Sequence, residues 1–412
     1  MTDDFLNLHV LVTSSVANAN RDDTGAPKQV TYGGVTRHRL SSQAMTRAKR
    51  VDFELTAGGD QISYRAKGGM IDLAMTQAAE LAAQSGQPLT DDETAKLRVL
   101  LTTSVSALVM NREKAVKAAA ERARGKQARD LKARTAANPE AADAVGIPAG
   151  EDVAEDTGKK DTLTWLAEHE VGDLVAKSLT TVRAGTAPDD FINKGGRTQS
   201  LSIAAFGRMF AFRPELQNEA AVQRSHAFTT HAADIEPDYF TAVNDLPQAG
   251  EGSGAGHLDM AQYGGGTFYW HANIDRRQLW ATWIAGDDEA VTRTRLQTFF
   301  TSLLLALPSG KQATTAHKTV PDAVLAVPAA SPVALHQAFE APVAATGDGF
   351  RAPSVERLLA AHEQVRAFTP RQFPSPALYA GTLNAPTSST VTAQPSLDAV
   401  VDACVDWAMA GR

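Results

Sequence analysis

The chain has 412 residues, 43% of them hydrophobic, and a formal net charge of −7. This length is typical of two to three domains, or of one domain with large insertions. Its single cysteine, Cys404, excludes an intramolecular disulfide and a cysteine-based zinc cluster. The N-terminal residues do not resemble a signal peptide, and no apolar run is long enough to span a bilayer, so we expect a cytoplasmic protein without membrane contact.

The first predicted element is a strand over residues 5–14. Leu6, Leu8, Val10 and Val12 alternate with other residues and therefore share one face. Such a pattern is typical of a half-buried strand.

A basic segment follows at residues 20–50. It contains seven Lys or Arg and two Asp within a chain that is acidic as a whole. Arg37 and Arg39 lie two residues apart, so we expect both on one face of a short strand. Either Ser41 or Ser42 is suited to cap the helix that follows.

That helix is predicted over roughly residues 43–52. Gln43, Arg47 and Arg50 have the spacing i, i+4, i+7 and share one helix face. The first N–H groups of a helix attract an anion, so strand, cap and helix together predict a phosphate-binding surface. The alternative is an ordinary solvated strip of charge, and the sequence alone leaves both open.

The region from residue 68 to 179 is predicted to be mainly helical. Thr90 and Glu93 form a capping box before one apolar helix. Residues 112–134 form an alanine-rich segment with nine Lys or Arg, which predicts a basic helix. Residues 138–158 contain six acidic residues and no basic ones, which predicts a mobile loop.

The remaining chain is predicted to return to mixed structure. Alternation predicts a strand over residues 200–210, and GTFYWHANID over 266–275 is a second strong strand. Seven glycines between 250 and 266 indicate a loop tip. The order strand, helix, strand, strand, helix, strand predicts an α+β core, closed by a C-terminal helix with Ser396 as its cap.

A metal-dependent nuclease is the alternative that the histidines raise. His226, His231 and Asp234 have the spacing H-x4-H-x2-D. On a helix the two histidines would lie about 140° apart, which is poor for joint ligation of a metal. We therefore expect no metal, no cofactor and no catalytic residue, while keeping this alternative open.

Taken in order, the motifs resemble one known family. They are LNLHVLV, NRDD, YGG, R-x-R, SSQ with TRAKR, FGRM, AFTTH, DYFTAVNDL, GTFYWHANI, SGKQ and DGFRAPS, from Leu6 to Ser354. This set is similar to the CasC family, the backbone subunit of type I-E CRISPR Cascade complexes.

The resemblance implies an α+β fold with an RRM-like (ferredoxin-like) palm, a large helical fingers insertion and a long β-hairpin thumb. The implied parts are palm at 1–57, 200–230 and 267–412, fingers at 58–199 and thumb at 231–266.

The resemblance also implies which residues contact RNA. The implied RNA-binding residues are Arg21, Lys28, Arg37, Arg39, Ser41, Ser42, Gln43, Arg47, Arg50, Arg208, Met209, Lys311 and Gln312. The thumb triplet Tyr239, Phe240 and Thr241 is expected to cover a displaced base. The chain departs from the pattern at Thr46, where some members have Lys, and at Ala313, where some have Arg.

The implied function is non-catalytic. Copies of the chain would stack head to tail along a CRISPR guide RNA, hold its phosphate backbone and kink it at regular intervals. The remaining bases would pair with a target DNA strand in antiviral defence. The implied partners are the guide RNA, neighbouring copies of the chain, other Cascade subunits and, through the guide, target DNA. The alternative is a metal-dependent RNA-processing ribonuclease on the same fold.

Overall fold

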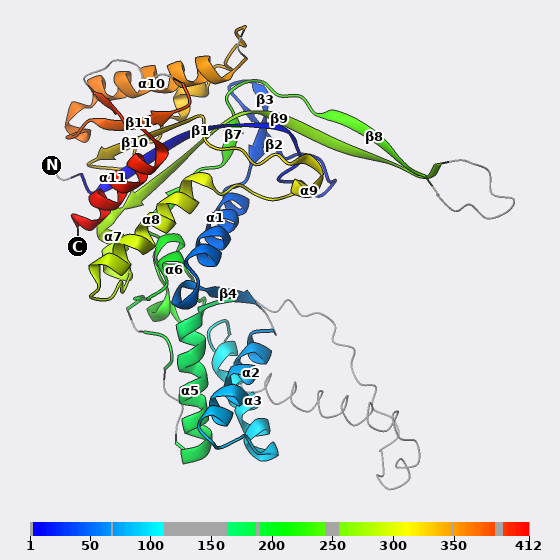
Figure 1. Ribbon diagram of the computed structural model, residues 1–412, viewed down its shortest axis with the longest axis vertical. Helices are drawn as coiled ribbons and strands as arrows, with labels where there is room; N and C mark the ends of the chain where they lie inside the picture. The colour runs from blue at the N-terminus through cyan, green and yellow to red at the C-terminus, as the bar shows by residue number, and fades with distance from the viewer. Residues whose placement is uncertain are drawn as a thin grey trace, which may run out of the picture. The chain divides into compact units, whose positions relative to one another are not determined.

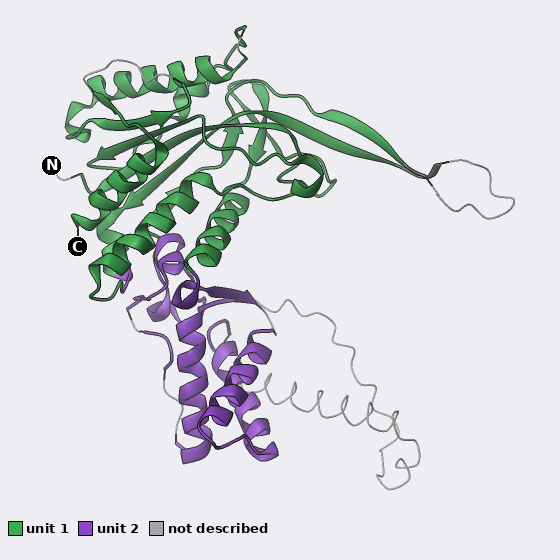
Figure 2. Ribbon diagram, viewed as in Figure 1, with its two compact units in different colours: residues 1–57, 220–281, 285–412 green, residues 58–219, 282–284 purple. Residues whose placement is uncertain are grey.

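Two compact units make up the protein (Figure 2). Unit 1 comprises residues 1–57, 220–281 and 285–412, and unit 2 comprises 58–219 with 282–284. The computed structural model describes residues 3–66, 69–110, 163–186, 190–193, 195–243, 255–347, 349–383 and 390–411. The basic helix predicted at 112–134 and the acidic loop predicted at 138–158 lie outside these described residues.

One large mixed sheet forms the centre of unit 1. Its strands are β1 (Phe5–Ala17), β2 (Gln29–Tyr32), β3 (Val35–Leu40), β6 (Val222–Arg224), β7 (Ala227–Thr229), β8 (Glu236–Val243), β9 (Ala255–Asp275), β10 (Ala323–Ala329), β11 (Ala377–Gly381) and β12 (Val391–Ala393). They are ordered β12-β11-β10-β1-β9-β7-β3-β2, and β6 and β8 also pair with β9. The strand pairs are antiparallel except β11 with β12.

Helices cover both faces of this sheet (Figure 1). They are α1 (Ser42–Ala57), α7 (Arg276–Thr282), α8 (Glu289–Leu305), α9 (Gln312–Thr315), η4 (His336–Phe339), α10 (Arg351–Phe368), η5 (Pro370–Gln372) and α11 (Leu397–Met409). Ser396 caps α11 by accepting the Ala399 N–H at 3.2 Å, as predicted. Unit 1 combines this sheet with helices, so the predicted mixed α+β class is confirmed.

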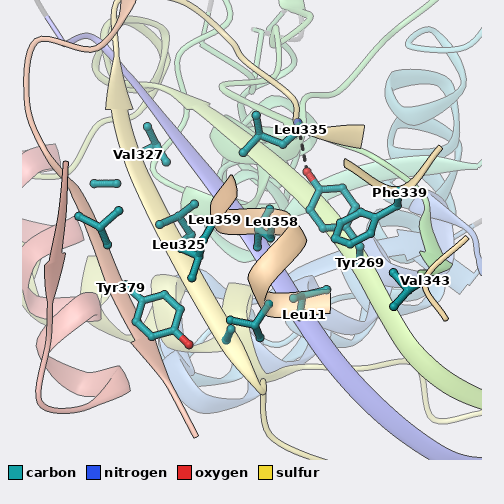
Figure 3. Close-up of a cluster of buried hydrophobic side chains, with 14 of the residues drawn as sticks. Leu11, Tyr269, Leu325, Val327, Leu335, Phe339, Val343, Leu358, Leu359 and Tyr379 are labelled. Carbon is teal, nitrogen blue, oxygen red and sulfur yellow. Dashed lines mark hydrogen bonds between the residues drawn. The ribbon is translucent and has the colours of Figure 1, made fainter. Parts of the chain in front are cut away.

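The face of the sheet beneath α10 buries an apolar cluster with a polar centre (Figure 3). Leu11, Tyr269 and Leu358 belong to the cluster, and the Tyr269 hydroxyl lies 3.3 Å from the Leu335 N–H that donates to it. On the same face, His9 is 1% exposed and its Nδ1 lies 2.9 Å from the Tyr269 hydroxyl oxygen. The prediction of a half-buried first strand is therefore wrong, because α10 and η4 bury the second face as well. Only tertiary packing decides this.

The opposite face packs on α1 and α8. Val10 pairs with Trp270 across the two strands, and the Lys49 ammonium of α1 lies 4.3 Å from the centre of the Trp270 ring. Phe53 of α1 and Phe299 of α8 contact edge to face at 5.6 Å between ring centres. These contacts fix α1 against the sheet by burying large aromatic surfaces.

Strand β9 continues beyond the end of β1 and forms a two-stranded ribbon with β8 (Figure 1). The pairing with β1 becomes irregular between Ser14 and Ala17, opposite glycines of β9. Gly266 has φ +142°, and a Cβ there would lie 2.3 Å from the His231 ring. A side chain would clash at this point, so glycine is required where the ribbon leaves the sheet.

Unit 2 is a helical unit with a short ribbon. Its elements are η1 (Gly59–Gln61), β4 (Ser63–Ala66), α2 (Gly69–Gln84), α3 (Asp91–Ser106), β5 (Thr164–Ala167), α5 (Glu168–Ala184), α6 (Leu201–Phe206) and η3 (Pro214–Leu216). The predicted capping box is confirmed, since the Thr90 N–H donates to the Glu93 carboxylate at 2.9 Å and the Glu93 N–H donates to the Thr90 hydroxyl at 3.2 Å.

The strand predicted over residues 200–210 is wrong, because residues 201–206 form the helix α6. Every residue from Leu201 to Ala205 is buried, so apolar side chains cover all sides of the segment and its period is ambiguous. Ile203 packs in a cluster with Trp165 and Ala167 of β5. These contacts place residues 200–219 in unit 2.

Acid should destabilise unit 1 through its buried histidines. Burial lowers the pKa of His271 to about 3 and that of His362 to about 4, and burial with neighbouring His271 lowers the pKa of His9. Below about pH 6.5 the unfolded chain binds protons that the folded chain does not, so stability falls as pH falls. We expect a total loss of about 1.4 kcal/mol per histidine between about pH 7.5 and pH 5.5, measured by urea unfolding.

The variant His362→Leu provides the matched comparison. Both ring nitrogens of His362 are buried without a hydrogen-bond partner in the described part of the chain. The variant should therefore have a shallower pH dependence than the wild type. Parallel pH profiles for the two proteins would contradict this assignment.

Candidate nucleic-acid interface

Hydrogen bonds made by its own polar side chains fix the conformation of the loop between β1 and β2. The Asp22 carboxylate accepts the Thr24 N–H at 2.9 Å and the Ala26 N–H at 3.0 Å. A hydrogen bond from the Thr24 hydroxyl at 2.7 Å, together with these backbone bonds, holds the pKa of Asp22 below its ordinary value. Arg21 remains exposed beside this turn and Lys28 is partly exposed at its end. Asp22 therefore shapes the loop that presents two basic side chains.

Strand β3 carries both arginines of the R-x-R pair, but only Arg39 is accessible. Arg37 is fully buried, and its guanidinium donates at 2.9–3.2 Å to four backbone carbonyl oxygens. These acceptors belong to Tyr32, Thr229, Phe339 and Glu340. The prediction that Arg37 binds RNA is wrong, since η4 and the residues after it cover this part of β3.

The start of α1 is capped by two different side chains. The Ser41 hydroxyl accepts the Ala44 N–H at 3.2 Å, and the His226 ring nitrogen Nδ1 accepts the Ser42 N–H at 2.8 Å. The Gln43 N–H has no acceptor among the described residues. One N–H of the first turn therefore remains available to an anion.

The exposed stripe of α1 is shorter than predicted. Gln43 and Arg47 are exposed, four residues apart. Arg50 is only 12% exposed at its side chain and donates to the Glu54 carboxylate at 2.8 Å. An intrahelical ion pair thus neutralises Arg50, and its proposed RNA contact loses support. The i, i+4 spacing to Glu54 is visible in the sequence.

His226 holds the helix start only as a neutral imidazole. Its Nδ1 lies 3.4 Å from the Arg39 guanidinium in addition to accepting the Ser42 N–H. Burial and the charges of Arg39, Arg224 and Lys28 lower the pKa of His226. Both neighbours of Nδ1 are donors, so this nitrogen carries no proton.

The suggested metal constellation is not assembled in the described part of the chain. His231 is buried and stacked on Phe350 at 3.6 Å between ring centres, and its Nε2 accepts the Thr267 N–H at 3.2 Å. His226 is committed to α1. Within the described ranges, no three His, Cys, Asp or Glu side chains are placed to hold a metal ion.

The SGKQ segment joins the same region of unit 1. A Cβ on Gly310 would lie 2.5 Å from the Ala19 carbonyl oxygen, so this segment contacts the loop after β1 closely. Lys311 has a left-handed backbone with φ +51°, and its ammonium lies 5.3 Å from the centre of the Tyr263 ring of β9. Gln312 begins α9 and is exposed.

These elements bring together five basic side chains without acidic partners. None of them forms an ion pair with a described residue. We call this set the α1 cation surface: Arg21, Lys28, Arg39, Arg47 and Lys311. Backbone bonds connect its parts, since the Arg39 N–H donates to the Lys28 carbonyl at 2.7 Å and the Lys28 N–H to the Asn20 carbonyl at 3.0 Å. Such a surface suits a chain of phosphates.

Large apolar side chains lie exposed on the β8–β9 ribbon. Tyr239 is 69% exposed and Phe240 is 44% exposed, and Thr241 beside them is exposed too. Tyr239 pairs with Met260, which is 45% exposed. Adjacent residues of a strand point to opposite faces, so Tyr239 and Phe240 offer one aromatic ring on each face of the ribbon.

In unit 2, Arg208 of the GRM motif is buried and Met209 of the same motif is exposed. Arg208 is 4% exposed, and two of its guanidinium nitrogens donate to the Glu170 carboxylate, at 2.5 and 2.9 Å. Met209 is 79% exposed. The prediction that Arg208 contacts RNA is corrected to a structural role: it anchors the loop that displays Met209.

The sequence did not predict that Arg224 of β6 contacts the start of α1. Its Nη2 donates to the Ser42 carbonyl and to the Thr46 hydroxyl. Arg224 lies 182 residues from Ser42 in sequence. No local pattern signals such a contact.

Comparison with known proteins agrees with these observations. A family model described as CT1975-like protein matches residues 6–403. A solved chain of a "CRISPR RNA-guided surveillance complex, pre-nicking" is 27% identical, with a TM-score of 0.70 over 98% of this chain and 100% of that one. A chain of a "CRISPR RNA-guided surveillance complex" is 24% identical, with a TM-score of 0.56 over 98% of both chains, and shows likeness of fold. No curated protein matches the sequence.

Helix composition adds one further observation. Among the helices that the structure describes, none is both long and apolar enough to cross a membrane.

The structural role of Arg208 predicts a large loss of stability on truncation. Arg208→Ala leaves the buried Glu170 carboxylate without its partner, which should cost about 3–5 kcal/mol in urea unfolding. Replacing both residues, as Arg208→Met with Glu170→Leu, should cost less. The exposed pair of Lys96 and Asp92 in the same unit is the control, and Lys96→Ala should cost under about 1 kcal/mol. Equal losses for Arg208→Ala and Lys96→Ala would contradict the anchoring role.

Proposed function

The chain belongs to the CT1975-like protein family, the CasC family that its motifs resemble, and from this membership we propose that it is a guide-RNA-binding subunit of a CRISPR surveillance complex. The observation that carries the proposal is the α1 cation surface, five unpaired basic side chains on an acidic protein. The similarity to a subunit-length chain of an RNA-guided complex supports the same conclusion.

The chemistry of the surface favours phosphate over bases. Arginine, lysine, a serine-capped helix start and a free backbone N–H are groups that bind phosphate and sugar without reading sequence. A protein that must hold any guide needs this property, because base pairing reads the target. The net negative charge of the chain disfavours indiscriminate binding of nucleic acid.

We extend the proposal to an assembly of type I-E. The succession of strands and helices supports an RRM-like palm, with unit 2 as fingers and the β8–β9 ribbon as thumb. Copies would stack head to tail on the guide, a heterologous contact that propagates along an RNA. The exposed rings of Tyr239 and Phe240 would displace one base at each repeat, so that the others pair with target DNA.

We also propose that the protein is not an enzyme. The two histidines that raised a nuclease alternative have other partners: His226 caps α1, and His231 supports the backbone of β9. Neither is free to activate a water molecule. No observation favours catalysis as a second function.

Charge reversal tests the proposal directly. The double variant Arg39→Glu with Arg47→Glu should weaken binding of single-stranded RNA by at least about tenfold per site and reduce the salt slope by about 0.7 for each lost phosphate contact. Arg371→Glu is the matched control, since Arg371 is an exposed arginine of η5 that lies outside the surface. Filter binding across a salt series measures both quantities.

Two outcomes of the binding measurements would count against the proposed site. Equal weakening by the control would indicate a general charge effect. Undiminished RNA binding by the double variant would contradict the proposed site.

The thumb residues should affect the spacing of the assembly rather than stability. Tyr239→Ser with Phe240→Ser removes exposed rings, so thermal unfolding should shift little. In the assembled complex, chemical probing should show regularly spaced reactive bases for the wild type. The double variant should lose this regularity, and an unaltered pattern would argue against a base-displacing thumb.

A further inference from the structure

Arg224 lies directly behind the first turn of α1. It is the last residue of β6 and pairs with Ala272 of β9, which places it on the face of the sheet that packs on α1. Its Nη2 donates to the Ser42 carbonyl and the Thr46 hydroxyl. One guanidinium therefore contacts both ends of the helix turn that carries Gln43.

This guanidinium has no counter-charge within the described residues. Its Nε and Nη1 are buried and lack a hydrogen-bond partner there. A second cation that interacts with it is also buried: Lys49 is 1% exposed and donates to the Ala306 carbonyl at 3.0 Å. Arg224 contributes to lowering the pKa of Lys49, after burial itself. Arg224 thus has neutral partners only, whereas the charge of Asp52 acts on Lys49 in the opposite sense.

An unpaired buried cation costs free energy, so a protein keeps one where an anion compensates it. The pKa of Arg224 is lowered by burial to about 9, which still leaves it protonated at neutral pH. Its Nη2 contacts Ser42 and Thr46, which lie directly before Gln43 and directly before Arg47 in the helix. Surrounding protein has a lower dielectric than water, which strengthens the field at that point.

We propose that Arg224 is a positioning residue of the phosphate site: it fixes the first turn of α1 and supplies positive charge beneath the phosphate that binds at Gln43 and Arg47. This inference rests on the proposed function. It also accounts for Thr46, since the cation that this position lacks arrives from β6 instead of from the helix. Arg224 acts through the helix turn, because its free nitrogens are buried.

Substitutions can separate the two effects of Arg224, which are its hydrogen bonds to α1 and its positive charge. Arg224→Gln keeps an amide donor and removes the charge, whereas Arg224→Lys keeps the charge and removes the planar fork. The double variant Arg224→Gln with Thr46→Lys returns a positive charge to the same turn from the helix side. Thr46 is partly exposed, so a lysine there has room to extend.

The experiment measures RNA affinity and its salt slope for these variants of the full chain, with thermal unfolding as a control for folding. The probe is a single-stranded RNA of mixed sequence. Arg224→Gln should weaken binding by about tenfold and reduce the salt slope by about 0.7. Arg224→Lys and the Thr46→Lys double variant should recover most of both.

Three outcomes would overturn the inference. Unchanged affinity and slope in Arg224→Gln, beside weakened binding in Arg47→Glu, would remove Arg224 from the site and leave the proposed function standing. Equal losses in Arg224→Gln, Arg224→Lys and the double variant would make the role merely structural. Unchanged binding in both Arg224→Gln and Arg47→Glu would contradict the proposed function itself.

Discussion

A basic side chain that leaves bulk water needs an opposite charge or hydrogen-bond acceptors, and at the start of α1 no described residue forms an ion pair with Arg39 or Arg224. Arg39 has only a neutral histidine and Arg224 only neutral oxygens, while Lys49 is buried against a carbonyl and an aromatic ring. Elsewhere buried arginines have a charged partner or several acceptors, Glu170 for Arg208 and four carbonyl oxygens for Arg37, whereas Arg224 keeps two buried nitrogens without a partner among the described residues. This unsatisfied charge beneath α1 points to an anion that arrives with a partner.

The fold concentrates this charge by bringing distant segments to one helix. Strand β9 is the common support, because β1, β6, β7 and β8 all pair with it. The loop after β1 accepts the Ser41 N–H through Asn20, and Arg224 and His226, at and after the end of β6, contact Ser42. The same strand continues into the ribbon that exposes Tyr239 and Phe240. The pairing partners of β9 near α1 and the exposed aromatic rings thus share one continuous scaffold.

Local features could be predicted well from the sequence, but the burial of side chains by elements distant in sequence could not. The core strands and the caps at Thr90 and Ser396 follow from alternation and helix-start chemistry, and both caps are observed. Arg37 and Arg39 are alike in sequence, yet η4 covers only the first, and no local pattern records that. The contact of Arg224 with α1 likewise depends on the pairing of β6 with β9. Long-range pairing therefore decided which basic residues remain available.

Sequence-independent binding of RNA is the property that tests the account most directly. Affinities should be measured for single-stranded RNAs of equal length and unrelated sequence, over a range of salt concentration. The account predicts equal affinities and a common slope of about −4.2 per copy, from the five residues of the α1 cation surface and Arg224 at about 0.7 each. Affinities that differ by sequence, or a slope near zero, would contradict a site built to hold phosphates.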